Sequence, residues 1–326
     1  MNENNVSYVW DGQFTSEDFE AEMGVRQGCV LSTLLFILFI NDIVEEVGGG
    51  IEFGSLRIPC LIFADDIVFL AESVDGMQLM INRLEHYCDL WNLTVNLGKS
   101  KMMIFRDGGG RYSRNERWTY KGQNLEIVRE YNYLGVLICA NLNVKKHFET
   151  KLAEAKRAIS SIWGRCIESR FVDHSAKIQI FRATASSIML YGAQVWGCWQ
   201  FDIVEKFQRY FLKRIFRLTA CTPNYMVHLE TTMPPLFLNT LKLHIDFIMK
   251  LLEMDETRLP KLILKSVIIL RGNLVKKWEE IGVECGERLQ IQPGIGPTIL
   301  RNMFQNLLGG VARSAYSGYT LEAQSS

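Results

Sequence analysis

The spacing of apolar residues changes once along the chain, near residue 140. Up to that point, short apolar runs alternate with polar turns, which is typical of strands and hairpins. Four segments have this pattern: residues 6–24, 51–73, 99–105 and 131–138. Beyond it, apolar residues recur at steps of three and four, which is typical of amphipathic helices. The chain is therefore predicted to be α+β to residue 140, with helical regions at 141–222 and 223–326.

Two helices are predicted within the first region. Residues 29–47 are apolar on nearly every side, so we expect a buried helix that ends at the glycines 48–50. Residues 74–96 have one apolar and one polar face, as an amphipathic helix does. A polar, glycine-rich loop is expected at 107–117.

Three helices are predicted in the region 141–222. The first has an apolar stripe made of Phe148, Leu152, Ala155, Ile159, Ile162 and Cys166. The second covers residues 175–197 and the third covers residues 202–218. The last region begins with prolines and is also predicted to be helical, whereas the tail after residue 297 is expected to be frayed.

The third of these helices is predicted to carry two stripes. One is apolar: Ile203, Phe207, Phe211, Ile215 and Leu218. The other is basic: Lys206, Arg209, Lys213 and Arg217. A helix that packs one stripe into a core and presents four cations in a row can follow a phosphate backbone. A solvated basic face is the alternative.

The overall composition, 48% hydrophobic and 22% charged, is typical of a globular protein. The longest apolar run is too short to cross a bilayer, and no signal peptide pattern is present, so no membrane partner is expected. The eight cysteines include no Cys-x-x-Cys pair, which favours reduced thiols in an intracellular protein and no structural zinc. Trp91, Trp163 and Trp196 are expected in the core.

The net charge is zero, but the charges are unevenly distributed. Residues 1–96 contain sixteen acidic and three basic side chains, whereas the remainder contains 20 acidic and 33 basic ones. An acidic part next to a basic part suits a cation site beside a polyanion-binding surface. Two oppositely charged solvated surfaces are the alternative reading.

Asp65 and Asp66 stand side by side in the apolar segment LIFADDIVFL, residues 61–70. The pattern predicts a tight hairpin with this pair at its turn and with buried flanking strands. Carboxylates in a dry setting need a positive partner, and the hairpin itself contains no lysine or arginine. Mg²⁺ suits them, because it is held by one or two carboxylates together with substrate phosphates. A merely polar turn is the alternative.

Four segments occur in an order and spacing that resemble a known family: GVRQGCVLSTLLFILFINDI, LIFADDIVFL, VNLGKSKMMIF and YNYLGVLI. They resemble the reverse transcriptase domain of non-LTR (LINE-type) retrotransposons. The similarity continues through MLYGAQVWG and TPNYMVHLETTMPPL. The resemblance implies a right-hand polymerase, with a palm remnant to residue 140, a helical thumb at 141–222 and a helical C-terminal region.

The resemblance also implies roles for single residues. Asp65 and Asp66 would be catalytic ligands of a two-ion Mg²⁺ site, and Phe63 stands where the family often has tyrosine. Arg26, Gln27 and Gly28 would position template and nucleotide. Lys99 and Lys101 would help pyrophosphate leave. Tyr133, Leu134 and Gly135 would form the primer grip, and the basic stripe Lys206, Arg209, Lys213 and Arg217 would contact nucleic-acid backbone.

Each of these residues also has a simpler interpretation. Gln27 and Gly28 could form only a loop, and Tyr133 could be a core residue. Lys99 and Lys101 could protect an exposed strand edge from pairing.

By the resemblance, the function is RNA-directed DNA polymerisation, in which a primer 3′-hydroxyl attacks the α-phosphate of a deoxynucleoside triphosphate. Template RNA and a DNA primer would be partners, and a retrotransposon polymerase would work in the nucleus. The family has a further catalytic aspartate upstream of RQG, and no comparable aspartate precedes Arg26. We therefore expect a truncated domain that lacks one carboxylate ligand and is inactive alone. Alternatives are a non-catalytic nucleic-acid-binding remnant, a relic without function, and a maturase- or telomerase-like polymerase.

Overall fold

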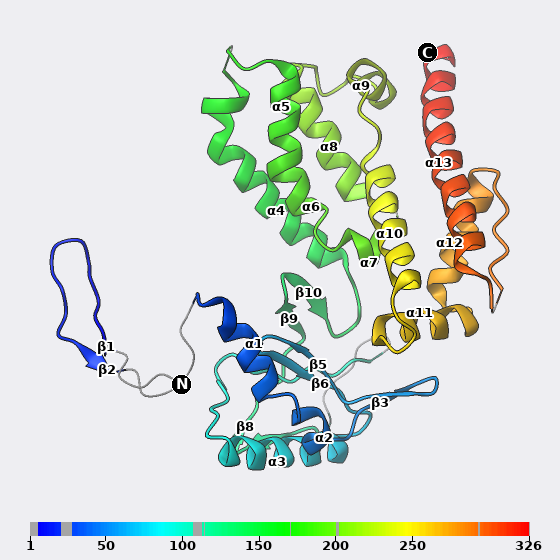
Figure 1. Cartoon of the computed structure of the whole chain (residues 1–326). Coiled ribbons are helices and arrows are strands. Elements are labelled where there is room, and N and C mark those ends of the chain that lie inside the picture. Colours follow the sequence, from blue (N-terminus) through cyan, green and yellow to red (C-terminus); the bar gives the residue numbers. More distant parts are fainter. Residues whose placement is uncertain are drawn as a thin grey trace. The chain divides into compact units, whose positions relative to one another are not determined.

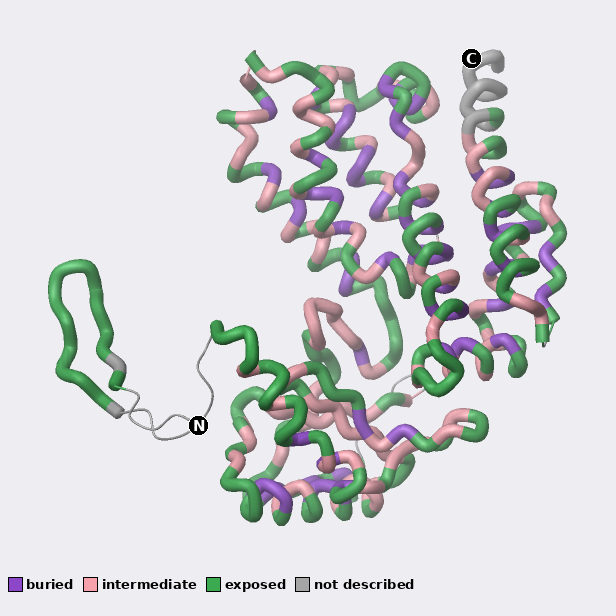
Figure 2. Tube along the Cα trace, viewed as in Figure 1, coloured by how far each residue is buried: buried purple, intermediate pink, exposed green. Residues whose placement is uncertain are grey.

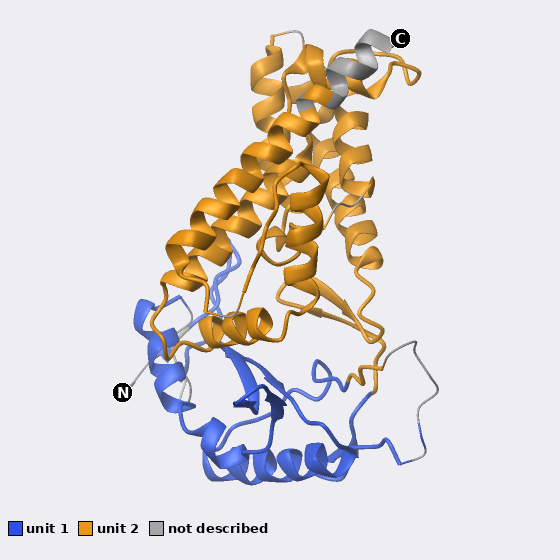
Figure 3. Cartoon of the chain, turned by 90° about the vertical axis from the view of Figure 1, so that its right-hand side faces the viewer, with its two compact units in different colours: residues 1–102, 111–126 blue, residues 103–110, 127–326 orange. Residues whose placement is uncertain are grey.

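The computed structural model describes residues 6–20, 28–106, 113, 115–169, 171–199, 202–292 and 294–325. The chain forms two compact units (Figure 3). Unit 1 comprises residues 1–102 and 111–126, and unit 2 comprises residues 103–110 and 127–326. Both helices and strands are present, so the fold is α+β as predicted. No helix among the described residues combines the length and apolar character needed to cross a membrane.

The strands of unit 1 form short antiparallel hairpins. Among its described residues these are β1–β2 (Val6–Ser7 and Phe19–Glu20), β3–β4 (Ile51–Phe53 and Leu56–Ile58), β5–β6 (Cys60–Phe63 and Asp66–Phe69) and β7–β8 (Thr119–Tyr120 and Gln123–Asn124). The strands predicted at 6–24 and 51–73 are therefore confirmed, although residues 21–24 lie outside the described residues. The strand predicted at 99–105 is wrong, because this segment contains only an isolated bridge residue.

Unit 1 also contains three helices in its described part: α1 (Val30–Phe39), α2 (Ile43–Val47) and α3 (Val74–Leu90). The glycines that were predicted to end the first helix do end α2, whose cap residue Gly48 has φ 58°. Ser73 caps α3 by accepting a hydrogen bond from the Gly76 amide at 3.1 Å. A small core forms where α2 and α3 meet, around Ile43, Val47, Met80 and Tyr87.

Helix α1 departs from its predicted burial. None of its residues is buried, and Val30 and Leu38 are 92% and 63% exposed (Figure 2). A helix that is apolar on every side needs neighbours on every side. In the described part of unit 1, α1 is held chiefly at its C-terminal end, where the Phe39 and Trp91 rings meet at 5.4 Å. The helical conformation is confirmed, but the single helix predicted at 29–47 is interrupted at residues 40–42 and forms α1 and α2. The prediction of burial is wrong for α1, whereas Ile43 and Val47 of α2 are buried.

Unit 2 begins with the hairpin β9–β10 and continues as helices (Figure 1). The hairpin pairs Glu130–Tyr133 with Val136–Cys139, so residues 131–138 form two strands and not the single strand predicted. The helical elements are α4 (Lys145–Ile162), α5 (His174–Phe181), α6 (Ser187–Met189), α7 (Ala193–Trp196), α8 (Asp202–Ile215), α9 (Asn224–Thr231), α10 (Leu236–Glu253), α11 (Leu259–Ile269), α12 (Asn273–Glu284) and α13 (Pro297–Ser325), with the π turns η1 (Trp163–Ile167) and η2 (Arg182–Ser186).

Two large apolar clusters hold unit 2 together. The first joins α4, η2 and α8. The rings of Phe181 and Phe211 stack there with their centroids 4.1 Å apart. The second joins α10 to α13 around the fully buried Trp278, whose ring meets that of Phe304 at 5.1 Å. Because Phe304 and its neighbours on α13 enter this core, the prediction of a frayed tail after residue 297 is wrong.

Two other helix predictions for unit 2 need correction. The helix predicted at 175–197 is interrupted by η2 and again at Gly192, whose φ is 76°. Helix α8 ends at Ile215, three residues earlier than predicted. Arg217 follows the helix with a left-handed φ of 53°. The predicted basic stripe therefore does not run along one continuous helix.

Candidate functional site

The pair Asp65 and Asp66 lies at the tip of the β5–β6 hairpin. Phe63 pairs with Asp66, so Ala64 and Asp65 form a two-residue turn. Ala64 has φ 52°, a left-handed conformation that such tight hairpin turns require. The hairpin thus presents two adjacent carboxylates at one end of the ladder, as predicted.

The surroundings of the pair are less dry than predicted. Asp65 and Asp66 are both exposed, and so are the last three residues of β5. Phe63, directly across the ladder from Asp66, is 61% exposed. A hairpin tip lies beyond the end of its own ladder, so only packing from another segment could shield it. The prediction of buried flanking strands is wrong for β5, whereas β6 is partly buried.

The donor set at the tip fits a magnesium ion that a substrate also helps to bind. Two carboxylates are hard oxygen ligands, and Mg²⁺ in phosphate-transfer sites takes one or two of these with substrate phosphates. In the described part of the chain, no group of three or more aspartate, glutamate, histidine or cysteine side chains is placed to hold a metal. The site is therefore a two-carboxylate site among these residues.

The segment that precedes α1 is only partly described. Arg26 and Gln27 lie outside the described residues. Gly28 is exposed with φ 80°, and a Cβ added there would meet nothing within 4 Å. The backbone conformation, and not lack of space, is therefore what requires glycine at this turn.

The two lysines after α3 differ in their surroundings. Lys101 Nζ lies 2.6 Å from Glu126 Oε2, and its side chain is mostly covered. Lys99 is exposed and lies in a turn of residues 97–99. Its backbone amide donates a hydrogen bond to Asn96. Glu126 thus compensates the charge of Lys101 within unit 1.

A second hairpin tip is formed by Leu134 and Gly135, between β9 and β10. Both have left-handed φ values, 47° and 77°, as a two-residue turn of this kind requires. Tyr133, Leu134 and Gly135 are all half-buried. The three residues predicted to form a primer grip therefore lie at one tight turn of unit 2.

Two side chains outside the predicted set attach this second hairpin to the helices of unit 2. The Tyr191 hydroxyl donates to the Leu134 carbonyl at 2.6 Å, and a Cβ at Gly135 would come within 3.1 Å of the Tyr191 ring. The Leu137 amide donates to Nδ1 of His147 at 3.2 Å. Burial lowers the pKa of His147, which suits a ring nitrogen that must stay unprotonated to accept this bond.

The sequence did not reveal these roles of Tyr191 and His147, because each side chain contacts a hairpin residue in another segment of the chain. Tyr191 falls inside the segment MLYGAQVWG, whose Tyr-Gly pair was the available signal. Of the aromatic residues predicted in the core, Trp163 and Trp196 are half-buried, whereas Trp91 is 42% exposed.

The four cations of the predicted basic stripe have different environments. Lys206 lies 3.8 Å from Asp202 at the exposed start of α8. Arg209 lies 4.0 Å from Glu205, and this carboxylate also accepts a hydrogen bond from the Phe237 amide at the start of α10. Lys213 donates to the Ala220 carbonyl. At least Arg209 and Lys213 therefore contribute to local structure.

Residues 4–138 match the family model described as reverse transcriptase (RNA-dependent DNA polymerase). The chain is 26% identical over 202 residues to the RNA-directed DNA polymerase from mobile element jockey of Drosophila funebris, a match over 59% of this chain and 21% of that protein. It is 24% identical over 193 residues to the probable RNA-directed DNA polymerase from transposon X-element of Drosophila melanogaster. This match covers 56% of this chain and 20% of that protein.

A shorter match is more similar. Over 64 residues the chain is 41% identical to the Pol polyprotein from the type-1 retrotransposable element R2 of Nasonia vitripennis, over 19% of this chain and 6% of that protein. The chain thus spans about a fifth or less of the length of these three relatives.

The carboxylate hairpin β5–β6 lies inside the range that matches the reverse transcriptase family model. The chain is similar, over part of its length, to RNA-directed DNA polymerases of non-LTR retrotransposons.

Proposed function

We propose that the chain is part of a retrotransposon polymerase that copies template RNA from a DNA primer with deoxynucleoside triphosphates. The reaction is nucleotidyl transfer, in which the primer 3′-hydroxyl attacks the nucleotide α-phosphate. The carboxylate pair Asp65 and Asp66 at the β5–β6 tip, within the matched range, is the observation that carries this proposal. In this proposal the described part of unit 1 is the palm remnant, and residues 141–222 form the thumb.

Asp65 and Asp66 would hold Mg²⁺ against the nucleotide phosphates. A bound divalent cation supplies charge neutralisation for the reacting phosphate and for the oxygens that attack and leave. Exposure of both carboxylates to solvent supports this role, since a nucleotide can reach them. Phe63, the cross-strand neighbour of Asp66, would border the nucleotide, and Arg26, Gln27 and Gly28 would position it with the template.

Lys99 and Lys101 are the two lysine candidates for assisting the leaving pyrophosphate. Lys101 is compensated by Glu126 at 2.6 Å, so using it would first require that ion pair to separate. Tyr133, Leu134 and Gly135 would contact the primer from the second hairpin tip. Backbone contact by Lys206, Arg209, Lys213 and Arg217 belongs to the same proposal.

We further propose that the 326-residue chain, by itself, has little or no polymerase activity. Two carboxylates without a third leave a two-ion site short of negative charge and of ligands. A non-catalytic nucleic-acid-binding protein is the second candidate, favoured by the basic balance of the chain after residue 96.

A primer-extension assay of the purified chain tests activity. Primed RNA template, Mg²⁺ and deoxynucleotides should give no more incorporation than Asp65→Ala does. Clear incorporation above that control would overturn the proposed inactivity and support the two-carboxylate site.

Metal binding is tested separately by the paramagnetic broadening that Mn²⁺ causes in NMR spectra. We expect broadening near the β5–β6 tip, to be strengthened by added deoxynucleotide. Asp65→Asn with Asp66→Asn should abolish it, and equal broadening in this variant would remove the metal role of the pair.

A further inference from the structure

One surface of unit 2 combines exposed cations with aromatic rings from two helices. It consists of Lys156 on α4, Trp163 at the start of η1, and Tyr210 and Arg214 on α8, and is called here the Trp163–Tyr210 face. Tyr210 is 49% exposed, and Lys156 and Arg214 are also exposed. Sequence reasoning missed it because its members come from separate segments and because Trp163 was expected in the core.

The side chains of this face hold one another in place. The Arg214 guanidinium lies 3.8 Å from the centroid of the Trp163 ring, and Nη1 of Arg214 donates to the Tyr210 hydroxyl at 3.1 Å. Lys156 Nζ lies 5.7 Å from the centroid of the Tyr210 ring. A guanidinium fixed against an indole has already lost much of its rotamer freedom, so binding an anion costs less further entropy.

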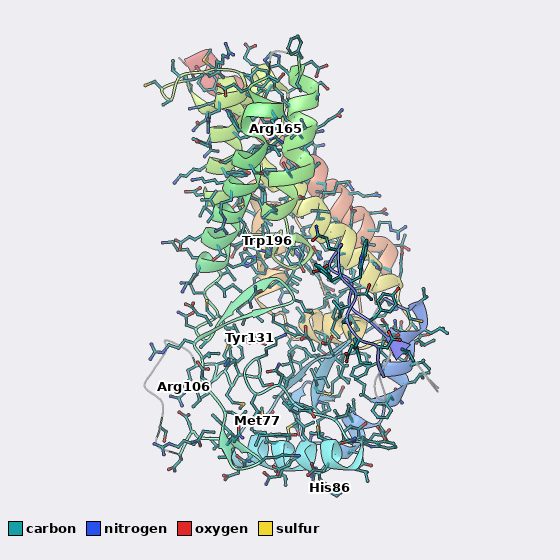
Figure 4. The ribbon with its side chains drawn as sticks, turned by 90° about the vertical axis from the view of Figure 1, so that its left-hand side faces the viewer. Met77, His86, Arg106, Tyr131, Arg165 and Trp196 are labelled. Atoms are coloured by element: carbon teal, nitrogen blue, oxygen red, sulfur yellow. The ribbon has the colours of Figure 1, made fainter. Side chains whose placement is uncertain are left out.

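The π turn η1 contributes to this arrangement. It begins at Trp163, whose ring meets that of Phe211 edge-on at 6.1 Å, so the indole is anchored to the core and also carries Arg214. Such widened turns are rare and occur often at functional sites. The same turn bears the exposed Arg165 (Figure 4).

The cations of this face differ from those of the basic stripe on α8. In the part of the chain that the structure describes, no carboxylate forms an ion pair with Lys156 or Arg214. By contrast, Arg209 faces Glu205 and Lys213 is bonded to the Ala220 carbonyl. The charges of the Trp163–Tyr210 face are therefore more available to an external anion.

We infer that the Trp163–Tyr210 face binds the phosphodiester backbone of the nucleic acid that the chain engages, and that it contributes more to this contact than Arg209 and Lys213 do. The inference rests on the proposed function and deepens it by naming the binding residues. Unpaired cations that are held in place by aromatic rings match the phosphates of a nucleic-acid backbone.

Fluorescence anisotropy with a labelled RNA–DNA duplex, measured over a range of salt concentrations, tests this inference. The double variant Lys156→Gln and Arg214→Gln should bind at least tenfold more weakly. Its slope of log affinity against log salt should be shallower by about 1.8, since each lost phosphate contact removes about 0.9.

The matched control removes two charges from another part of unit 2. Lys250 on α10 and Lys276 on α12 are exposed and have no ion pair among the described residues. Lys250→Gln with Lys276→Gln should change affinity less than twofold and leave the slope unchanged. Equal affinity loss in the two double variants would overturn the assignment of this face.

A third variant separates charge from geometry. Arg214→Lys keeps the cation and loses the planar stack on Trp163, so we expect a several-fold loss with an unchanged salt slope. Wild-type affinity in Arg214→Lys would contradict the idea that stacking on Trp163 prepares Arg214 for binding. If the wild-type chain does not bind the duplex at low salt, the proposed function fails together with this inference. If it binds and the face variants match wild type, only the inference fails.

Discussion

The two units of this chain both contain strongly apolar segments but bury them very differently. In unit 1, the described core is a cluster around Ile43, Val47, Met80 and Tyr87, while no residue of α1 is buried. In unit 2, two extensive clusters bury aromatic residues of α4, α5, α8, α10, α12 and α13. An apolar sequence therefore indicates where burial is needed, but a partner segment must exist for burial to occur.

This difference bears on the proposed site. The carboxylate hairpin belongs to the unit with the smaller core, and its strand β5 is largely exposed. The second hairpin, β9–β10, belongs to the unit with the larger core and is bonded to its helices. We therefore expect unit 2 to unfold at the higher temperature, and the following changes test how each unit is held.

Gly197→Ala should have the largest effect, because it forces two segments of unit 2 apart. A Cβ there would come within 2.1 Å of the Thr240 carbonyl oxygen on α10 and 2.4 Å of that of Ala193. We expect a loss of at least about 4 kcal/mol in the free energy of unfolding. Gly164→Ala is the control, since its Cβ would meet nothing within 4 Å and should change stability by less than about 1 kcal/mol. Denaturant titrations measure both, and equal effects would contradict this account of the packing.

Two substitutions in unit 1 compare a buried with an exposed apolar residue. Ile43 is buried, so Ile43→Ala should lower the free energy of unfolding by roughly 2–5 kcal/mol. Leu38, on the exposed α1, should tolerate Leu38→Ala within about 0.5 kcal/mol. Chemical denaturation followed by tryptophan fluorescence measures the two. A large cost for Leu38→Ala would show that α1 is covered in solution.

Acid should weaken unit 2 through His244. Burial lowers the pKa of this histidine to about 4, and its ring accepts a hydrogen bond from the Trp278 indole and donates to the Gln194 carbonyl. Its unfolded pKa is near 6.5, so the folded form binds fewer protons between these values. Stability is complete above about pH 6.5 and falls as pH drops toward 4, by about 3 kcal/mol at pH 4.

The measurement is the melting temperature of unit 2 between pH 7 and pH 4. His244→Gln should flatten the curve, although the lowered pKa values of His147 and His228 leave a residual slope of the same sign. An unchanged curve in the variant would exclude His244 as the cause.

The smallest effect concerns the attachment of the second hairpin. Tyr191→Phe removes the hydrogen bond to the Leu134 carbonyl and keeps the ring against Gly135, so it should cost about 1 kcal/mol. Amide exchange at the β9–β10 turn should speed up while exchange in α10 stays unchanged. Faster exchange throughout unit 2 would indicate a general loss of stability instead.

Local signals carried much of the prediction. The Ala64–Asp65 turn follows from a short apolar hairpin pattern, and α3 begins at a serine cap, so both depend on neighbouring residues alone. The same holds for the α+β class. The single strand predicted at residues 131–138 is wrong because Leu134 takes a left-handed conformation that leucine rarely adopts. Gly135 was therefore the only local signal of a turn.

Long-range contacts explain the remaining errors. The pairing of Lys101 with Glu126 and of Tyr191 with Leu134 joins residues far apart in the chain, and no local pattern specifies it. The exposure of α1 and the order of α13 depend on whether a partner surface exists. Phe304 has Trp278 as such a partner, whereas Val30 has none among the described residues.

The bond from Tyr191 to Leu134 has a practical consequence for protein engineering. The β9–β10 hairpin is hydrogen-bonded to the helical region that follows it. A chimaera that exchanges these helices with those of a relative should therefore exchange the hairpin as well. A crossover before Ile127 transfers the hairpin together with its tyrosine anchor. A crossover at residue 140 would pair one parent's turn with the other parent's anchor, and the graft would depend on whether the two still fit.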